Sequence, residues 1–252
     1  MSQKKARKAA FFKAHPICCF CGGETLATTE DHIPGRTIFE KKAWPEGFVF
    51  PACKPCNGDS SDDEVVLALL ARLGERKKTD IQEKELQSKI YEFRKQLPEI
   101  AKNIRGYTRP KERRLIESFN ISPWNNETNQ PRKAAVFPRE TFERVERFGR
   151  KLGKALHYLH TQKILPKEGI VKCKAITNAQ LNLLADDFFQ AALQAQANIN
   201  IVRSAQPLTD QFVYRFLIDK ETLLGLYIVA FGIDAILLLI TVEPRPGLLK
   251  ET

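Results

Sequence analysis

The sequence contains no internal repeat and no low-complexity segment, and cysteine is almost absent outside one short region. Five of the six cysteines lie between residues 18 and 56, and Cys173 stands apart. A secreted disulfide scaffold spreads its cysteines through a short chain, so this distribution excludes that class. Clustered cysteine pairs in a chain of 252 residues instead predict a metal site in a reducing, cytoplasmic compartment, of bacterial or phage origin.

Long apolar stretches are also rare. Residues 1–16 are basic and have no apolar core, so they predict a solvated tail or a helical arm and not a signal peptide. Residues 223–242 are long enough to cross a bilayer and carry only Asp234 as a charge. Gly232 and Asp234 interrupt their middle, and the preceding residues alternate as a strand does. We therefore expect two buried strands joined by a turn at 231–234, and no membrane contact.

Acidic residues are outnumbered. The formal net charge is +10, while a hydrophobic fraction of 43% and a charged fraction of 28% are typical of a soluble globular protein. Lysines and arginines that neutralise phosphates release counterions, so such an excess favours a polyanionic partner. Nucleic acid fits this charge better than an anionic membrane surface does, and solubility alone is the simpler explanation. The motifs described below favour DNA over RNA as the partner, and a homodimer is an alternative.

The hydrophobic periodicity predicts an α+β fold in three parts. Residues 1–75 form a metal-organised module with short strands, ending in a helix that Ser61 and Glu64 open as a capping box. Residues 76–132 form a charged helical connector that is interrupted at Pro98 and rich in turn formers from residue 106 onward. Residues 133–252 form an α+β domain of unknown role with an antiparallel sheet.

Within this last part the pattern predicts two helices and several strands. Helices are expected over 139–160 and 178–197, and strands at 134–137, near 200, and over 212–219, 224–231 and 235–242.

Two Cys-x2-Cys pairs provide the candidate metal ligands, and 31 residues separate them: Cys18, Cys21, Cys53 and Cys56. Each pair can place two thiolates on one tight turn, and two turns can close a tetrahedral zinc site. Four thiolates leave no open coordination position, so this zinc would be structural. Cys19 and His15 are alternative ligands, with a less usual spacing or a simpler surface role, and Cys173 fits a buried strand position.

Asp31 and His32 follow one another between the cysteine pairs, and Asn57 directly follows the last cysteine. This order of Cys-x2-Cys, Asp-His and Cys-x2-Cys-Asn resembles the zinc-stapled branch of the HNH, or ββα-metal, endonuclease superfamily, which includes junction-resolving phage endonucleases. The resemblance covers residues 15–75, about a quarter of the chain. The middle Asn of the HNH motif has no counterpart in "WPEGFVFPAC", and Asn57 stands where many members have a metal-binding His.

The resemblance implies a metal-dependent endonuclease that hydrolyses phosphodiester bonds. Asp31 and Asn57 would hold one divalent cation, Mg²⁺ or Mn²⁺, which prefer oxygen ligands. His32 would be the general base that activates water, a step worth about 10²–10⁴-fold. Without the resemblance, His32 could equally form a hydrogen bond within a turn of an ordinary zinc module.

Basic residues near the proposed site, and a denser block further along, are the candidate nucleic-acid contacts: Arg36, Lys41, Lys42, Lys54, Arg109, Arg113 and Arg114. A second basic stripe lies on the helix expected over 139–160, where Arg144, Arg147, Lys151 and Lys154 lie away from the apolar face. Such a stripe is typically the solvated side of an amphipathic helix. Two alternatives to a nuclease remain: a non-catalytic zinc module that binds nucleic acid, and a regulatory or interaction protein with a purely structural zinc.

Overall fold

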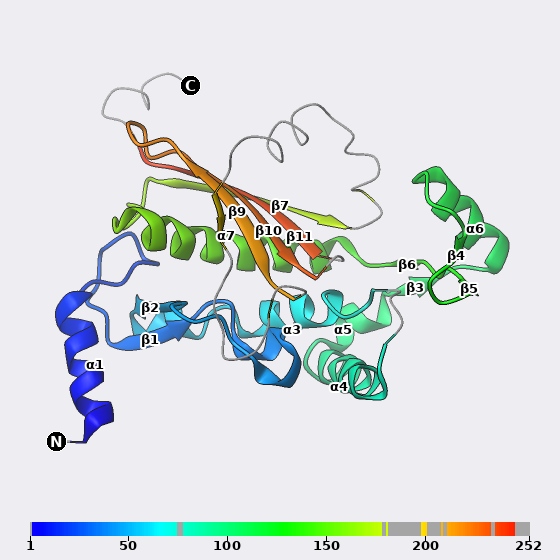
Figure 1. Ribbon diagram of the computed structural model, residues 1–252, viewed down its shortest axis with the longest axis horizontal. Coiled ribbons are helices and arrows are strands. Elements are labelled where there is room, and N and C mark those ends of the chain that lie inside the picture. The colour runs from blue at the N-terminus through cyan, green and yellow to red at the C-terminus, as the bar shows by residue number, and fades with distance from the viewer. Residues whose placement is uncertain are drawn as a thin grey trace.

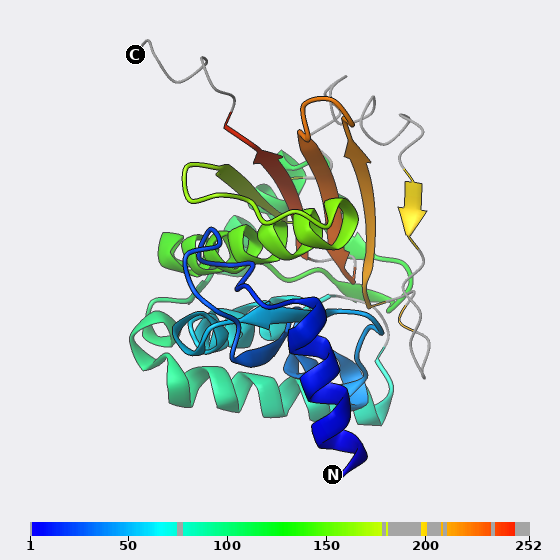
Figure 2. The same ribbon diagram turned by 90° about the vertical axis from the view of Figure 1, so that its left-hand side faces the viewer.

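The computed structural model describes residues 2–74, 78–177, 180, 198–200, 208, 211–232 and 235–244. They form three layers (Figures 1 and 2). A five-stranded sheet lies on one side, the long helix α7 (Arg139–Thr161) lies in the middle, and the N-terminal strands and helices lie on the other side. Mixed helix and antiparallel sheet confirm the α+β class. The helix expected over 178–197 lies, apart from residue 180, outside the described residues.

The sheet is antiparallel throughout, in the order β7-β11-β10-β9-β8. Its strands are β7 (Ile170–Thr177), β8 (Asn198–Asn200), β9 (Val213–Ile218), β10 (Gly225–Phe231) and β11 (Ala235–Val242). Most of the apolar run at 223–242 therefore forms the two paired strands β10 and β11, as predicted, and every second residue of each strand is buried. Within the described ranges, no helix combines the length and apolarity that a bilayer crossing requires.

Helix α7 packs against the sheet through small and apolar residues. Phe148, Leu152 and Leu156 are fully buried on this face. Gly149 and Gly153 let the backbone approach β7, because a Cβ at Gly149 would lie 2.3 Å from the sulfur of Cys173. The helical period of these residues matches the predicted apolar face, and the predicted helix at 139–160 is confirmed.

The N-terminal layer begins with the exposed helix α1 (Gln3–Ala14). Strands β1 (Thr29–His32) and β2 (Val49–Ala52) then form an antiparallel pair, and helices α2 (Lys54–Asn57) and α3 (Ser61–Leu70) follow. The expected capping box at Ser61 is wrong. The N-cap is Ser60, without a side-chain capping bond, and Ser61 is the first helical residue.

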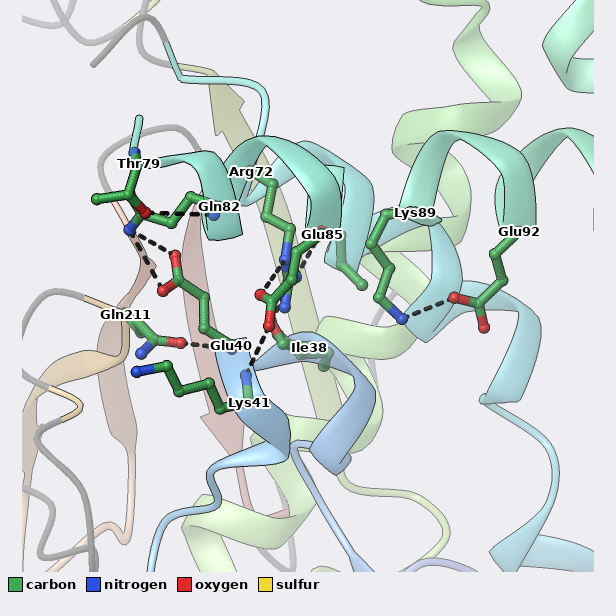
Figure 3. A network of polar contacts seen from close by, with 11 residues as sticks. Ile38, Glu40, Lys41, Arg72, Thr79, Gln82, Glu85, Lys89, Glu92 and Gln211 are labelled. Atoms are coloured by element: carbon green, nitrogen blue, oxygen red, sulfur yellow. Dashed lines mark hydrogen bonds and ion pairs between the residues drawn. The ribbon is translucent and has the colours of Figure 1, made fainter. Parts of the chain in front are cut away.

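Helix α4 (Asp80–Gln96) packs on α3 and α5 (Pro98–Lys102) packs on α4, with the predicted break at Pro98 between them. A polar network joins α3 and α4 to the short turns η1 (Arg36–Ile38) and η2 (Glu40–Lys42), as Figure 3 shows. The buried Arg72 donates to the carbonyl of Ile38 at 2.7 Å, and Glu85 accepts from the backbone of Lys41 at 3.0 Å. Glu40 receives a hydrogen bond from Gln82 at 3.0 Å and donates its backbone N–H to Gln211 at 2.7 Å. The network fixes the turn that follows β1.

Residues 105–136 form a lobe at the end of the molecule away from α1 (Figure 1). Strands β3 (Arg105–Gly106) and β6 (Ala135–Val136) pair as its stalk, and it contains α6 (Arg109–Ser118) and the hairpin β4 (Trp124–Asn125) and β5 (Gln130–Pro131). We expected a turn-rich connector here, which is wrong for α6. Pro110 lies in the first helical turn, where its missing N–H costs no hydrogen bond.

Candidate functional site

The two predicted cysteine pairs meet in space. The sulfurs of Cys18, Cys21, Cys53 and Cys56 all lie within 4.8 Å of one another. Tetrahedral zinc with Zn–S bonds of about 2.3 Å needs sulfurs about 3.8 Å apart, so the four thiols could hold a metal such as zinc. His15 does not join them, since its Nδ1 lies 2.7 Å from the Tyr158 hydroxyl.

Electrostatics within the cluster favour a cation. Burial and the neighbouring thiol of Cys53 raise the pKa of Cys56. For Cys53, burial is outweighed by hydrogen bonds, which lower the pKa of that thiol to about 7. Four thiolates this close repel one another unless a metal ion neutralises them.

The basic stripe on α7 faces the N-terminal layer, so the expectation that it is a solvated face is wrong. Arg147 donates two hydrogen bonds to the buried Asp63, at 2.7 and 2.6 Å. Arg144 lies 3.6 Å from the same carboxylate, and Lys154 donates to the carbonyl of Phe20 at 2.6 Å. These cations attach α7 to α3 and to the first cysteine turn.

Lys151 is the most deeply buried member of this stripe, with a side chain only 8% exposed. Its ammonium lies 2.5 Å from the carbonyl oxygen of Cys56, 2.6 Å from Asp59 Oδ1 and 2.9 Å from Asp31 Oδ2. The Ser60 hydroxyl lies 3.2 Å away. Four oxygens from β1 and from the loop after the second cysteine pair thus surround one positive charge.

Carboxylates outnumber cations around Lys151. Burial raises the pKa of Asp31, although the ion pair with Lys151 opposes this shift. Glu64 on α3 is mostly buried, and burial together with the charge of Asp31 raises its pKa to about 7. Its carboxylate packs on Gly35, where a Cβ would lie 2.0 Å from Oε2, so a larger residue at position 35 would displace the Glu64 side chain. Asp31, Asp59 and Glu64 leave negative charge that one lysine does not neutralise.

His32 has different neighbours from Asp31, because consecutive residues of a strand point to opposite faces. Its ring lies 4.6 Å from the ring of Trp44, and the guanidinium of Arg36 lies 5.6 Å from that indole. Burial and then Arg36 lower the pKa of the His32 imidazole, which favours the neutral form that can accept a proton.

The structure therefore does not bring Asp31, His32 and Asn57 together as one group. Helix α2, which ends at Asn57, packs on β1, and Lys151 contacts both Asp31 and the carbonyl beside Asn57. Asp31 and the loop that carries Asn57 are brought together, whereas His32 contacts Trp44 on the other face of β1.

The predicted nucleic-acid contacts fall in two places. Arg36 in η1, Lys41 and Lys42 in η2, and Lys54 at the start of α2 are exposed in the N-terminal layer. Arg109, Arg113 and Arg114 are exposed on α6 in the lobe.

Comparison with models of protein families, with curated protein sequences and with solved structures finds no match to this chain.

Several site residues were missed by the sequence analysis. Lys151, Asp59 and Glu64 surround Asp31, and Trp44 packs on His32. The carboxylates after Ser60 were interpreted as helix-capping groups, but Asp63 forms an ion pair and Glu64 is buried. Trp44 could have been noticed as a lone tryptophan between Asp-His and the second cysteine pair. Lys151 lies about 120 residues from Asp31, and no local pattern in the sequence connects the two.

Proposed function

We propose that the chain is a metal-dependent endonuclease of the HNH type that hydrolyses phosphodiester bonds, with DNA as its substrate. The observation that carries the proposal is the set of four oxygens around the Lys151 ammonium. One comes from Asp31 on β1, and the others come from the second cysteine pair and the loop that follows it. Lys151 contacts both Asp31 and the carbonyl oxygen of Cys56, next to Asn57, and this closeness of β1 and the loop supports a cation position shared by Asp31 and Asn57. The exposed lysines and the arginine around it supply contacts for phosphates.

The donor chemistry at this position fits a hard divalent cation. Carboxylate, amide and carbonyl oxygens suit Mg²⁺ and Mn²⁺, and several carboxylates around a single lysine favour a further cation. Asp31 and Asn57 would hold it. When bound, the cation supplies polarisation of a phosphoryl oxygen and stabilisation of the leaving oxygen.

The remaining chemistry belongs to the chain's own side chains. His32, whose neutral form is favoured by burial and the nearby Arg36, would take a proton from the attacking water, which requires the substrate to reach past the end of β1 from Asp31 to the face that carries His32. Trp44 limits the orientation of this ring by packing on it at 4.6 Å. Arg36 is exposed beside it and offers a charge for the phosphate.

A plasmid-nicking assay in Mg²⁺ or Mn²⁺ tests the proposal. We expect His32→Ala to lower the rate by about 10²–10⁴-fold, because the general base is lost, with zinc content and folding unchanged. His15→Ala is the matched control, since His15 contacts Tyr158 and lies outside the cation position. Equal rates for wild type and His32→Ala would contradict the assignment.

A second candidate function has one specific observation in its favour. The Lys151 ammonium already occupies the centre of this set of four oxygens, as expected if the module is a non-catalytic scaffold that binds nucleic acid. This alternative predicts oligonucleotide binding without cleavage in any divalent metal, in wild type and His32→Ala alike.

A further inference from the structure

The lobe of residues 105–136 contains a cavity that is separate from the cation position. It lies between α6 and the β4–β5 hairpin and has a volume of about 240 Å³. Arg109, Glu112, Arg113 and Ile116 recur at helical spacing, so one face of α6 forms one wall. The hairpin and its flanks form the other wall, with Pro123, Trp124, Pro131, Arg132 and Lys133.

We propose that this cavity binds an unpaired base of a nucleic-acid strand, with the neighbouring phosphates held by the basic residues at its rim. The proposal rests on the proposed function in that the strand is the substrate of the same protein. It adds a preference for single-stranded or locally unpaired nucleic acid.

The indole of Trp124 is the group on which a base would stack. It is 45% exposed, and no other aromatic ring contacts it among the described residues. Ile116, Pro123 and Pro131 make the rest of the apolar lining. Stacking of a base on an exposed aromatic side chain stabilises single-strand binding and tolerates any base sequence. Bases of a duplex are already stacked and cannot enter.

The charge at the rim selects an anion. Among the described residues of the lining, Arg109, Arg113, Arg132 and Lys133 are basic and Glu112 alone is acidic, while Arg113 also pairs with Glu117 of its own helix. Glu112 is itself engaged, because it accepts a hydrogen bond from the backbone of Ala134 at 2.7 Å. A base with phosphates on either side complements an apolar floor with a cationic rim.

The hairpin wall is shaped before any ligand binds. The buried Asn125 accepts hydrogen bonds from the backbone of Glu127 at 2.9 Å and of Thr128 at 3.3 Å, which fixes the turn. The backbone of Arg132 donates to the carbonyl of Pro123 at 2.9 Å and closes the base of the hairpin. Preorganisation of this kind lowers the entropic cost of binding.

The size of the cavity limits its occupant. Sites that enclose drug-sized ligands measure about 300–1,000 Å³, and this cavity is smaller. One base fits such a space, while its sugar and phosphates remain at the rim. An acidic peptide with one aromatic side chain is the competing occupant, and the experiment separates the two.

The test measures binding without cleavage. Fluorescence anisotropy follows a labelled oligothymidylate and a duplex of equal length, in the His32→Ala background without added divalent metal. We expect Trp124→Ala to weaken binding of the single strand about tenfold and to leave duplex binding within about twofold. Arg109→Gln should reduce the salt dependence of single-strand binding by about 0.7 in the logarithmic slope, which corresponds to one phosphate contact.

Matched controls lie one turn apart on α4, away from the lobe. Tyr91→Ala removes an aromatic ring that is 69% exposed, and Arg94→Gln removes an exposed arginine. Both should bind the single strand as the parent does. Unchanged single-strand binding by Trp124→Ala, or an equal loss in Tyr91→Ala, overturns the proposal. Tighter binding of a labelled acidic peptide than of the oligonucleotide, lost in Trp124→Ala, also overturns it.

This outcome is independent of the nicking assay. Normal cleavage by His32→Ala with a tenfold loss of binding in Trp124→Ala would reject the catalytic assignment and retain the base-binding cavity. Loss of cleavage in His32→Ala with unchanged binding in Trp124→Ala would do the reverse.

Discussion

Helices α6 and α7 each carry a stripe of basic residues, and the structure uses the two stripes in opposite ways. On α7, Lys151 and Arg147 form ion pairs with Asp31 and Asp63 of the N-terminal layer. On α6 the basic residues are exposed, and Arg113 pairs with Glu117 of its own helix, at 2.8 Å. The α7 stripe joins two layers of the fold, whereas the α6 stripe remains available to a partner.

The difference lies in the acids that each stripe meets and not in the stripes themselves. Asp31 and Asp63 are buried, and a buried carboxylate needs a cation close by. Lys151 and Arg147 provide that charge from a helix that also packs on the sheet. Cations of α6 meet no such group among the described residues. A row of basic residues on a helix therefore indicates a binding surface only where these residues have no buried acidic partners within the fold.

Metal removal should give the largest effect and should act on the α7 side alone. We expect Cys53→Ser, or zinc chelation, to abolish protection of backbone amides in β1 and β2, with α6 unchanged. Structural zinc contributes about 10–16 kcal/mol in small peptides, which exceeds the net stability of many domains. Hydrogen exchange and metal analysis measure both effects. Cys173→Ser is the control and should retain one zinc per chain, because Cys173 lies on β7, outside the cluster.

Substitution of Lys151 compares the two stripes directly. Lys151→Met should lower the free energy of unfolding by about 3–5 kcal/mol, because Asp31 stays buried without its cation. Lys111→Met on α6 should change it by less than about 0.5 kcal/mol, since Lys111 is exposed. Urea denaturation measures both. If Lys151→Met left the free energy of unfolding unchanged, Asp31 would have another source of positive charge.

Double-mutant cycles sharpen the same comparison for arginine. The bidentate pair of Arg147 and Asp63 should show a coupling energy of about 1.5–3 kcal/mol, because Asp63 is buried. The exposed pair of Arg113 and Glu117 should show about 0.3–0.5 kcal/mol. Each cycle uses alanine replacements and thermal or urea unfolding. Equal couplings would contradict the proposed difference between the stripes.

Mild acid should lower the stability that α7 contributes to the fold, because α7 carries the buried His157 and the partly buried His160. Helix α6 has no histidine, and its contribution should stay the same. Burial lowers the pKa of His160 to about 4, while an unfolded histidine titrates near 6.5. Between these values the unfolded chain takes up a proton that the folded chain does not, so stability falls as the pH falls through this range. His160→Phe should remove about 1–2 kcal/mol of that fall, allowing for partial exposure, in urea unfolding at pH 7 and pH 5. An unchanged pH dependence in this variant would show that His160 is not responsible.

Patterns within short segments of the sequence correctly predicted several helices, strands and metal-ligand pairs. The spacing of Phe148, Leu152 and Leu156 predicted α7, and the interruption at Gly232 and Asp234, together with the alternation of the preceding residues, predicted β10 and β11. The Cys-x2-Cys pairs predicted the sulfur cluster, since each pair closes its own turn. Helix α6 was missed because Pro110 and a high density of turn formers obscured a short amphipathic segment.

Contacts between distant segments could not be predicted in the same way. The burial of Lys151 depends on Asp31, which lies 120 positions earlier, and no pattern around either residue reports that meeting. The stripe on α7 has the spacing of a solvated face, and only the position of the N-terminal layer shows otherwise. Asp-His followed by Cys-x2-Cys-Asn located the candidate site, while the neighbours of Asp31 needed coordinates.

The stalk of the lobe has one further consequence. Arg105 pairs with Val136 and Gly106 with Ala135, so the chain leaves the body and returns to it at adjacent positions. A two-residue hairpin turn can join such strands, which would permit excision of residues 107–134 without rerouting the remainder. The same geometry would allow transplantation of the excised segment into a surface hairpin of an unrelated host protein.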